Sequence, residues 1–249
     1  MKLDNVISVR SNKTVYRDGD RCIKVFNSDF SKADVLNEAL NQARIEETGL
    51  NTPKLYEVTM IDGRWAIVSQ FIEGTTLEQL MAESPEKKAE YIELLIDLQM
   101  KVHRETCPLL NRLKDKMSRK IAQSDFEATT RFALYARLAE TPKHRKICHG
   151  DFTPSNIVIT KDGTPYILDW SHATQGNASA DVARTYLSLK MSNTPEDAEL
   201  YLDRFCQKSG TEKQYVYHWL PIVAAAHSKT DDPISHKFYT ELVNNPERY

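Results

Sequence analysis

The pattern of hydrophobic and polar positions divides the chain into a β-rich part and a helical part. Short runs rich in β-branched residues predict strands near the start of the chain, and a change to helical spacing predicts one helix among them. Asp18-Gly19-Asp20 reads as a hairpin turn between two of these strands. The elements expected up to residue 72 are strands at 6–9, 14–17, 21–26, 54–60 and 64–72 and a helix at 31–47.

The helix expected at 31–47 has apolar residues at helical spacing and ends near Gly49, a residue type that favours helix ends. Its apolar stripe consists of Val35, Leu36, Ala39, Leu40 and Ala43. An amphipathic helix turns such a stripe toward the core.

After Gly74 the spacing of apolar residues becomes helical, with one β-rich interruption. Helices are expected at 76–82, 85–103, within 110–140 and from about 181 to the end, and a hairpin at 157–159 and 166–168. This order favours an α+β fold with a small β-rich lobe, residues 1–72, followed by a larger and mainly helical lobe, residues 73–249. A cleft between two such lobes is a usual place for a ligand.

Composition excludes several classes of protein. The chain has 249 residues, of which 41% are hydrophobic and 27% charged, so it can bury a sizeable core and is not a disordered chain. Its net charge of −2 lacks the basic excess of most nucleic-acid-binding proteins. We therefore expect no nucleic-acid partner.

The cysteines and the apolar runs indicate where the protein works. None of the four cysteines forms a C-x-x-C pair, which favours a reduced, intracellular compartment over a disulfide framework or a zinc site. Asp4 interrupts the start of the chain where a signal peptide needs an apolar run. The apolar stretch 219–226 is too short to cross a bilayer. We expect a cytoplasmic protein without a membrane segment.

The strongest motif lies around the expected hairpin. It reads His149-Gly150-Asp151-Phe152-Thr153-Pro154-Ser155-Asn156, followed by Ile167-Leu168-Asp169-Trp170. Asp151 and Asn156 share one loop and Asp169 follows across the hairpin, so three oxygen-bearing side chains can gather around one point. Mg²⁺ takes such carboxylate and amide oxygens, together with phosphate oxygens. Each residue alone would suggest a turn or a cap, but their spacing favours a site.

This motif resembles the catalytic loop and metal-binding motif of the aminoglycoside phosphotransferase and choline kinase group, which are relatives of protein kinases. The resemblance implies a two-lobed protein-kinase-like fold and the transfer of the γ-phosphate of ATP, with Mg²⁺, to a hydroxyl of a small molecule. Asp151 would orient that hydroxyl and take its proton, and Asn156 and Asp169 would hold the metal. His149 would brace the loop.

The same resemblance implies further parts of a nucleotide site. Lys24, which lies between apolar neighbours on its strand, would contact the α- and β-phosphates. Glu38 is the best candidate for its partner, although Glu46 lies nearer the apolar stripe of the helix and a solvated Glu38 is an equal alternative. Backbone groups at Gln70 and Ile72 would hold the adenine.

Two further segments complete the resemblance. The loop over the phosphates should be rich in glycine, but it reads Ser11-Asn12-Lys13, so backbone amides at Ser11 and Asn12 would cradle phosphate. An ordinary polar turn is the alternative for that loop. Asp181 would accept hydrogen bonds from the catalytic loop, or it would simply cap a helix.

The departures from protein kinases favour a small-molecule acceptor. Gly150 stands where those enzymes have arginine, and only about ten residues separate Trp170 from Asp181. The acceptor could be of aminoglycoside, choline or sugar type. Residues 101–146 hold twelve Lys and Arg against five Asp and Glu, which argues weakly against a polycationic antibiotic, unless an acidic rim such as Asp231-Asp232 compensates. GTP as donor, a nucleotide-binding pseudokinase and a small atypical protein kinase remain alternatives.

Overall fold

The computed structural model describes residues 1–192, 195–230 and 232–245. These form two compact units. The first consists of Met1–Glu83 and Pro154–His172, and the second of Ser84–Thr153 and Ala173–Tyr249. Asp231 of the suggested acidic rim lies outside the described residues.

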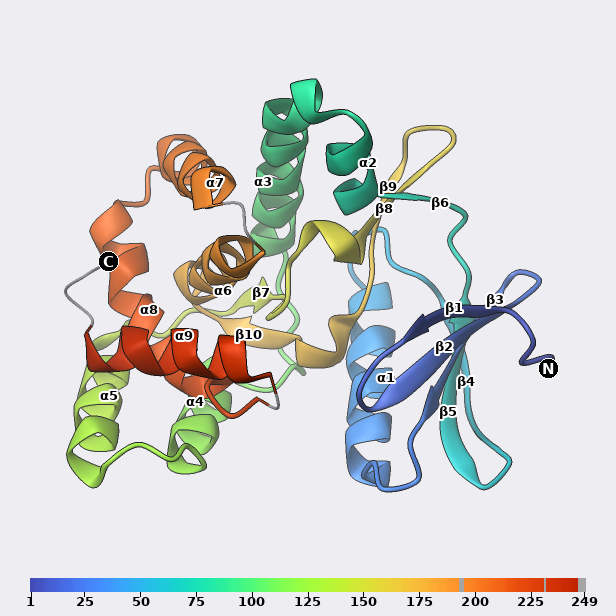
Figure 1. Cartoon of the computed structure of the whole chain (residues 1–249), viewed down its shortest axis with the longest axis horizontal. Coiled ribbons are helices and arrows are strands. Elements are labelled where there is room, and N and C mark those ends of the chain that lie inside the picture. The colour runs from blue at the N-terminus through green and yellow to red at the C-terminus, as the bar shows by residue number, and fades with distance from the viewer. Residues whose placement is uncertain (193–194, 231, 246–249) are drawn as a thin grey trace. The chain divides into compact units, whose positions relative to one another are not determined.

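An antiparallel sheet forms most of the first unit (Figure 1). Its strands are β1 (Val6–Val9), β2 (Lys13–Asp18), β3 (Arg21–Phe26), β4 (Leu55–Ile61) and β5 (Arg64–Gln70), in the order β1-β2-β3-β5-β4. All five strands predicted from the sequence are present. Asp62 and Gly63 both have left-handed backbone angles in the turn before β5, which suits a tight hairpin.

The helix α1 (Lys32–Glu46) packs against β4 and β5 (Figure 1). The side chain of Ser31 accepts the Ala33 N–H and begins the helix. Two residues of the apolar stripe, Leu36 and Leu40, are 44% and 47% exposed. The residues buried on α1 are Val35, Glu38, Ala39, Asn41 and Ile45. The inward face is therefore rotated toward Glu38.

Residues 154–172 pack with the first unit, although residues 84–153 separate them from the rest of that unit in the sequence. Strand β6 (Gly74–Thr76) pairs with β8 (Ile157–Thr160), which forms the predicted hairpin with β9 (Pro165–Ile167). Asn51 accepts the Ile167 N–H at 2.9 Å, and the Asn41 amide donates to the Ser171 carbonyl at 3.3 Å. The division into a nucleotide-binding lobe up to residue 72 and a catalytic lobe after it stays a prediction.

The second unit is mainly helical, as predicted. Its helices are α3 (Lys88–Arg104), α4 (Leu113–Ala122), α5 (Ala128–Glu140), α6 (Ala178–Met191), α7 (Pro195–Ser209), α8 (Lys213–His227) and α9 (Pro233–Asn244), and β7 (Lys146–Cys148) pairs with β10 (Thr174–Gly176). The short α2 (Leu77–Glu83) belongs to the first unit. Phe152, Tyr186, Tyr201 and Trp219 are fully buried in the core of the second unit.

Two other expectations concern the chain as a whole. All four cysteines are free thiols. In the part of the chain that the structure describes, no helix combines the length and the apolar character needed to cross a membrane.

Candidate active site

Lys24 and Glu38 form an ion pair in the first unit. The Lys24 Nζ lies 2.7 Å from Glu38 Oε1 and 3.4 Å from Asp169 Oδ1. Burial by itself lowers the pKa of a lysine, but the carboxylates of Asp169 and Glu38 outweigh it and raise the pKa of Lys24 well above its ordinary value. The lysine is therefore held as a cation in a half-buried place.

Glu46, the competing partner of Lys24, has another role. Its Oε1 accepts the Leu55 N–H at 2.6 Å at the start of β4. Of the two glutamates, Glu38 is the one that contacts Lys24, because the inward face of α1 is rotated toward it. Its part in a nucleotide site stays a prediction.

A second lysine joins the pair. Lys13 is 8% exposed, and its Nζ lies 3.3 Å from Glu38 Oε1 and 3.6 Å from Asp169 Oδ2. The strand register places it, because Lys13 lies opposite Phe26 and Val15 lies opposite Lys24, so both lysines point to one face of the sheet. We call Lys13, Lys24, Glu38 and Asp169 the lysine–carboxylate cluster. Sequence reasoning missed Lys13 as a site residue.

Asp169 follows β9 in a conformation that few residues adopt. Its φ of 59° is in the left-handed region, which costs about 1–2 kcal/mol for most residues and is easiest for Gly, Asn and Asp. The Trp170 indole N–H donates to the Ile167 carbonyl at 3.1 Å and fixes the chain on either side. The Asp169 side chain stays 30% exposed. Strain of this kind is often kept where a side chain must point in a set direction.

Asp169 and Asn156 are the two residues predicted to hold a metal. The Leu168 N–H donates to the Asn156 carbonyl at 2.8 Å, which brings the two stretches of backbone together within the first unit. No group of three or more His, Cys, Asp and Glu side chains with metal-site geometry occurs among the described residues. One carboxylate and one amide suit Mg²⁺, which keeps several waters and takes substrate phosphates as ligands, so the residues present fit this ion.

The catalytic-loop motif begins in the second unit. His149 is fully buried, and its Nδ1 accepts the Asp151 N–H at 3.2 Å. Its ring meets the Phe152 ring edge-on, with 5.6 Å between centroids. Gly150 between them has a φ of 83°, which favours glycine. These contacts favour the bracing role that the resemblance implies for His149, which stays a prediction.

Asp181 ties this loop to α6. Its Oδ1 accepts the Gly150 N–H at 2.6 Å, and its Oδ2 lies 3.0 Å from His103 Nε2 and 3.3 Å from Gln99 Nε2. Burial alone would raise the pKa of Asp181, but the hydrogen bond and charge of His103 outweigh it and lower the pKa. We call Asp181, His103, Gln99 and Gly150 the loop anchor. The helix N-cap is Asn177, so Asp181 is not a cap.

The Asp151 carboxylate has partners that the sequence reasoning did not predict. Arg184 Nη2 lies 2.9 Å from Asp151 Oδ1, and its Nη1 donates to the Tyr239 hydroxyl at 3.1 Å. Arg184 lies one helical turn after Asp181, so both can face the same loop. That spacing could have indicated Arg184 from the sequence. Nothing in the sequence pattern indicated Tyr239 on α9.

The remaining predicted residues lie in the first unit and stay predictions. The Gln70 N–H donates to the Lys54 carbonyl at 2.8 Å, and Ile72 follows the end of β5. Ser11 and Asn12 form a short turn before β2 whose two carbonyls accept hydrogen bonds from Asn27.

Comparison with known proteins shows which family the chain belongs to. The model of the phosphotransferase enzyme family matches residues 5–220, most of the chain. The chain belongs to the phosphotransferase enzyme family. This confirms the resemblance seen in the motif and the predicted class of enzyme, a phosphotransferase that acts on a small molecule. A search of curated protein sequences gave no significant match.

Solved structures show the same fold at low identity. A thermostable mutant of aminoglycoside phosphotransferase APH(4)-Ia, in complex with AMP-PNP and hygromycin B, has a TM-score of 0.72 at 15% identity, covering 98% of this chain and 92% of that one. Choline kinase LicA from Streptococcus pneumoniae has a TM-score of 0.65 at 16% identity over 99% and 95%. An aminoglycoside-3'-phosphotransferase of type VIII has a TM-score of 0.63 at 17% over 88% and 93%. The predicted α+β, protein-kinase-like fold is confirmed.

Proposed function

We propose that this phosphotransferase moves the γ-phosphate of ATP to a hydroxyl of a small molecule, with Mg²⁺ held by Asn156 and Asp169. The observation that carries the proposal is the position of Lys24, 2.7 Å from Glu38 and 3.4 Å from Asp169. A strand lysine paired with a helix glutamate is the arrangement that holds the α- and β-phosphates in kinase-like enzymes, next to the metal-binding carboxylate.

The first unit supplies the groups for the nucleotide. Lys24 neutralises phosphate charge, and backbone groups at Gln70 and Ile72 hydrogen-bond the adenine. Amides at Ser11 and Asn12 lie over the phosphates. Similar structures containing AMP-PNP or AMP support a nucleotide as ligand. GTP is the alternative donor, since backbone recognition of the base leaves room for either purine.

Asp151 supplies the base for the acceptor. As the hydroxyl oxygen bonds to the γ-phosphorus, its proton passes to the Asp151 carboxylate and the bond to the β-phosphate oxygen breaks, which releases ADP. Mg²⁺, when bound, offsets the negative charge of the phosphates. Arg184 keeps the carboxylate in one orientation through its 2.9 Å contact, and the loop anchor keeps the backbone beneath it in place.

The acceptor belongs to the hydroxyl-bearing small molecules, of aminoglycoside, choline or sugar type. The hygromycin B bound by one similar structure makes that compound a reasonable first acceptor to test. The seven-charge basic excess of residues 101–146 argues against a strongly cationic acceptor. A library should therefore include neutral and anionic alcohols.

Thermal stability tests the nucleotide part first. The melting temperature is measured with ATP, GTP and a non-hydrolysable analogue, each with and without Mg²⁺. A ligand that binds only the folded state raises the midpoint by mass action, so we expect a Mg²⁺-dependent rise with ATP. Absence of any shift at millimolar nucleotide would contradict the proposal. Binding without ADP release across the library would instead favour a pseudokinase.

A further inference from the structure

The turn over the proposed phosphate site lacks the glycine-rich backbone that covers the phosphates in kinase-like enzymes. Among the described residues other than glycine, only Asp62 and Asp169 have positive φ, so Ser11 and Asn12 lack left-handed angles. One form of anion-binding nest has right- and left-handed residues in succession, and this turn does not have that form. The turn is also held by its carbonyls, since Asn27 donates to Ser11 and Asn12 at 2.8 and 2.9 Å. A side chain next to the turn can supply the full positive charge that backbone amides lack.

Lys13 is the next residue, and its side chain lies on the same face of the sheet as Lys24. It begins β2 directly opposite Phe26, and its ammonium lies 5.6 Å from the centre of the Phe26 ring. On the same face, Lys24 lies two residues further along the neighbouring strand. The two ammonium groups share Glu38 and Asp169 as partners. Lys13 is therefore fixed beside the lysine that the proposed function assigns to phosphate.

Within the balanced cluster of two lysines and two carboxylates, Lys13 makes the looser contacts. Lys24 makes the short contact with Glu38, at 2.7 Å, whereas Lys13 lies at 3.3 Å from the same oxygen. A lysine is rarely this buried unless it is paired, and burying it has a free-energy cost that an apolar side chain of similar length would avoid. Such a cation suits a ligand that brings negative charge of its own.

We propose that Lys13 is a second phosphate-binding cation, which contacts the terminal phosphates of a nucleoside triphosphate and replaces the missing glycine-rich loop. The inference rests on the proposed function, because it assumes that the lysine–carboxylate cluster receives a nucleotide. It adds that Lys13 raises the affinity for a nucleotide with terminal phosphates more than the affinity for a nucleoside monophosphate. Lys13 does not touch the base or the sugar.

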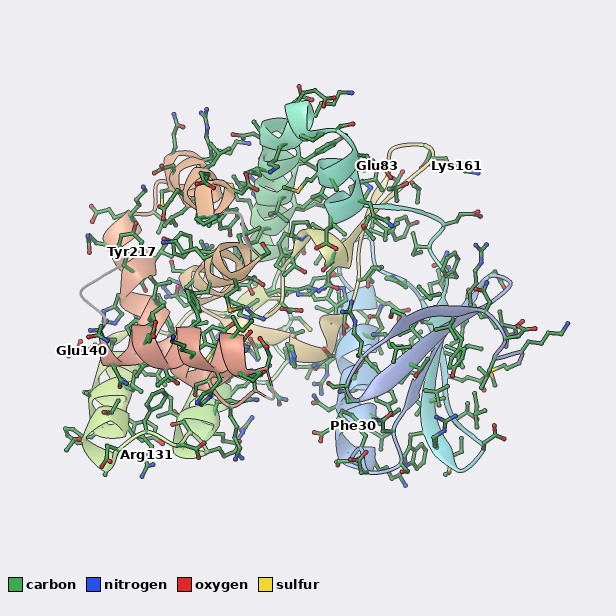
Figure 2. The ribbon with its side chains drawn as sticks, viewed as in Figure 1. Phe30, Glu83, Arg131, Glu140, Lys161 and Tyr217 are labelled. Atoms are coloured by element: carbon green, nitrogen blue, oxygen red, sulfur yellow. The ribbon has the colours of Figure 1, made fainter. Side chains whose placement is uncertain are left out.

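The test is calorimetric titration of Lys13→Met with AMP, ADP and ATP in the presence of Mg²⁺. The matched control is Lys161→Met in the same unit. Figure 2 shows Lys161 at the tip of the β8–β9 hairpin, where it is exposed. We expect Lys13→Met to weaken ATP binding by about 10- to 100-fold, the usual range for one charge-assisted contact, and AMP binding by less than about 3-fold. Lys161→Met should bind all three nucleotides like the unchanged protein.

Two results would overturn this proposal and leave the proposed function standing. Tight ATP binding by Lys13→Met would make Lys13 only a structural partner of Glu38. Equal losses for AMP and ATP would mean general damage to the site. If the methionine variant does not fold, Lys13→Gln replaces it, because its amide can still donate to Glu38 without a charge. The same loss of ATP affinity is then expected. A protein that binds no nucleotide even unchanged would overturn this proposal together with the proposed function.

Discussion

The lysine–carboxylate cluster and the loop anchor use buried charge in opposite ways. In the first unit, two lysines and two carboxylates neutralise one another, and the Asp169 side chain stays 30% exposed. In the second unit, the Asp181 side chain is fully buried and His103 is 5% exposed, and both are held by hydrogen bonds. The first arrangement can exchange its partners for a charged ligand. The second can lose a partner only at the expense of stability.

This difference predicts that changes in the two units separate function from folding. Residues that face a ligand should alter binding or turnover with little effect on unfolding. Residues of the loop anchor should alter unfolding first. Three substitutions in the second unit test how sharply the division holds, because that unit also carries Asp151.

Asp151→Asn should have the largest effect, and only on turnover. The hydroxyl loses its base, which accounts for about 10²- to 10⁴-fold in rate, while nucleotide binding persists because its groups lie in the first unit. ADP release with the first acceptor found in the library measures the rate, and calorimetry measures ATP affinity.

Arg184→Gln is the companion of Asp151→Asn. It removes the ion pair that orients Asp151 but leaves the carboxylate in place, so turnover should fall by less than in Asp151→Asn. Transfer at the unchanged rate by Asp151→Asn, in protein free of contaminating kinases, would remove Asp151 from the catalytic role.

Asp181→Ala should act mainly on folding. It leaves His103 and the Gly150 N–H without their acceptor, and removing one member of a buried pair costs about 3–5 kcal/mol. The free energy of unfolding in urea measures the loss. Glu140→Ala at the exposed end of α5, labelled in Figure 2, is the matched control and should be neutral.

The pH dependence gives an independent readout of Asp181. Folding lowers its pKa below the ordinary 3.8, so its stabilisation is complete above that value and is lost as the pH falls through the lowered pKa. Asp181→Ala should therefore flatten part of the acid limb of the stability curve. An unchanged acid limb together with unchanged stability would show that the loop anchor does not hold the loop.

Lys116→Met should have the smallest effect, and it compares lysines in the two units. Burial and then the repulsion of Lys120 lower the pKa of Lys116 from 10.5 to about 8, whereas the carboxylates of its cluster raise that of Lys24. Between pH 8 and 10.5 the unfolded chain holds more protons on Lys116 than the folded one, so stability should rise with pH.

Urea unfolding at both ends of that pH window measures the slope. The slope should shrink in Lys116→Met and persist in Lys101→Met, an exposed lysine on α3. The same slope in both variants would assign the pH dependence to other groups.

Local patterns predicted the parts of the site that depend on short spacing. Asp151, Asn156 and Asp169 lie within one motif of nineteen residues, and Lys24 stands out because its strand neighbours are apolar. The strand positions followed from β-branched runs for the same reason. All of this information is contained in a few neighbouring residues.

Long-range geometry explains what the sequence missed. Lys13 joins Lys24 only through the register of two strands, and a shift of one residue would place it on the other face. The preference for Glu38 over Glu46 depended on which face of α1 is turned inward. Leu36 and Leu40 indicated a different inward face, because apolar residues are often exposed. Contacts between Arg184 and Tyr239 join helices far apart in the chain.

The left-handed backbone at Asp169 decides how the metal site can be studied. An alanine there would lose the carboxylate and also carry the steric penalty of φ near 59°. A scan with alanine would therefore overstate the importance of the carboxylate, since two losses would be read as one. Asparagine, which tolerates this conformation and keeps one oxygen, isolates the charge, and glycine isolates the side chain. Any collection of variants ranked by alanine scores alone would misplace this position.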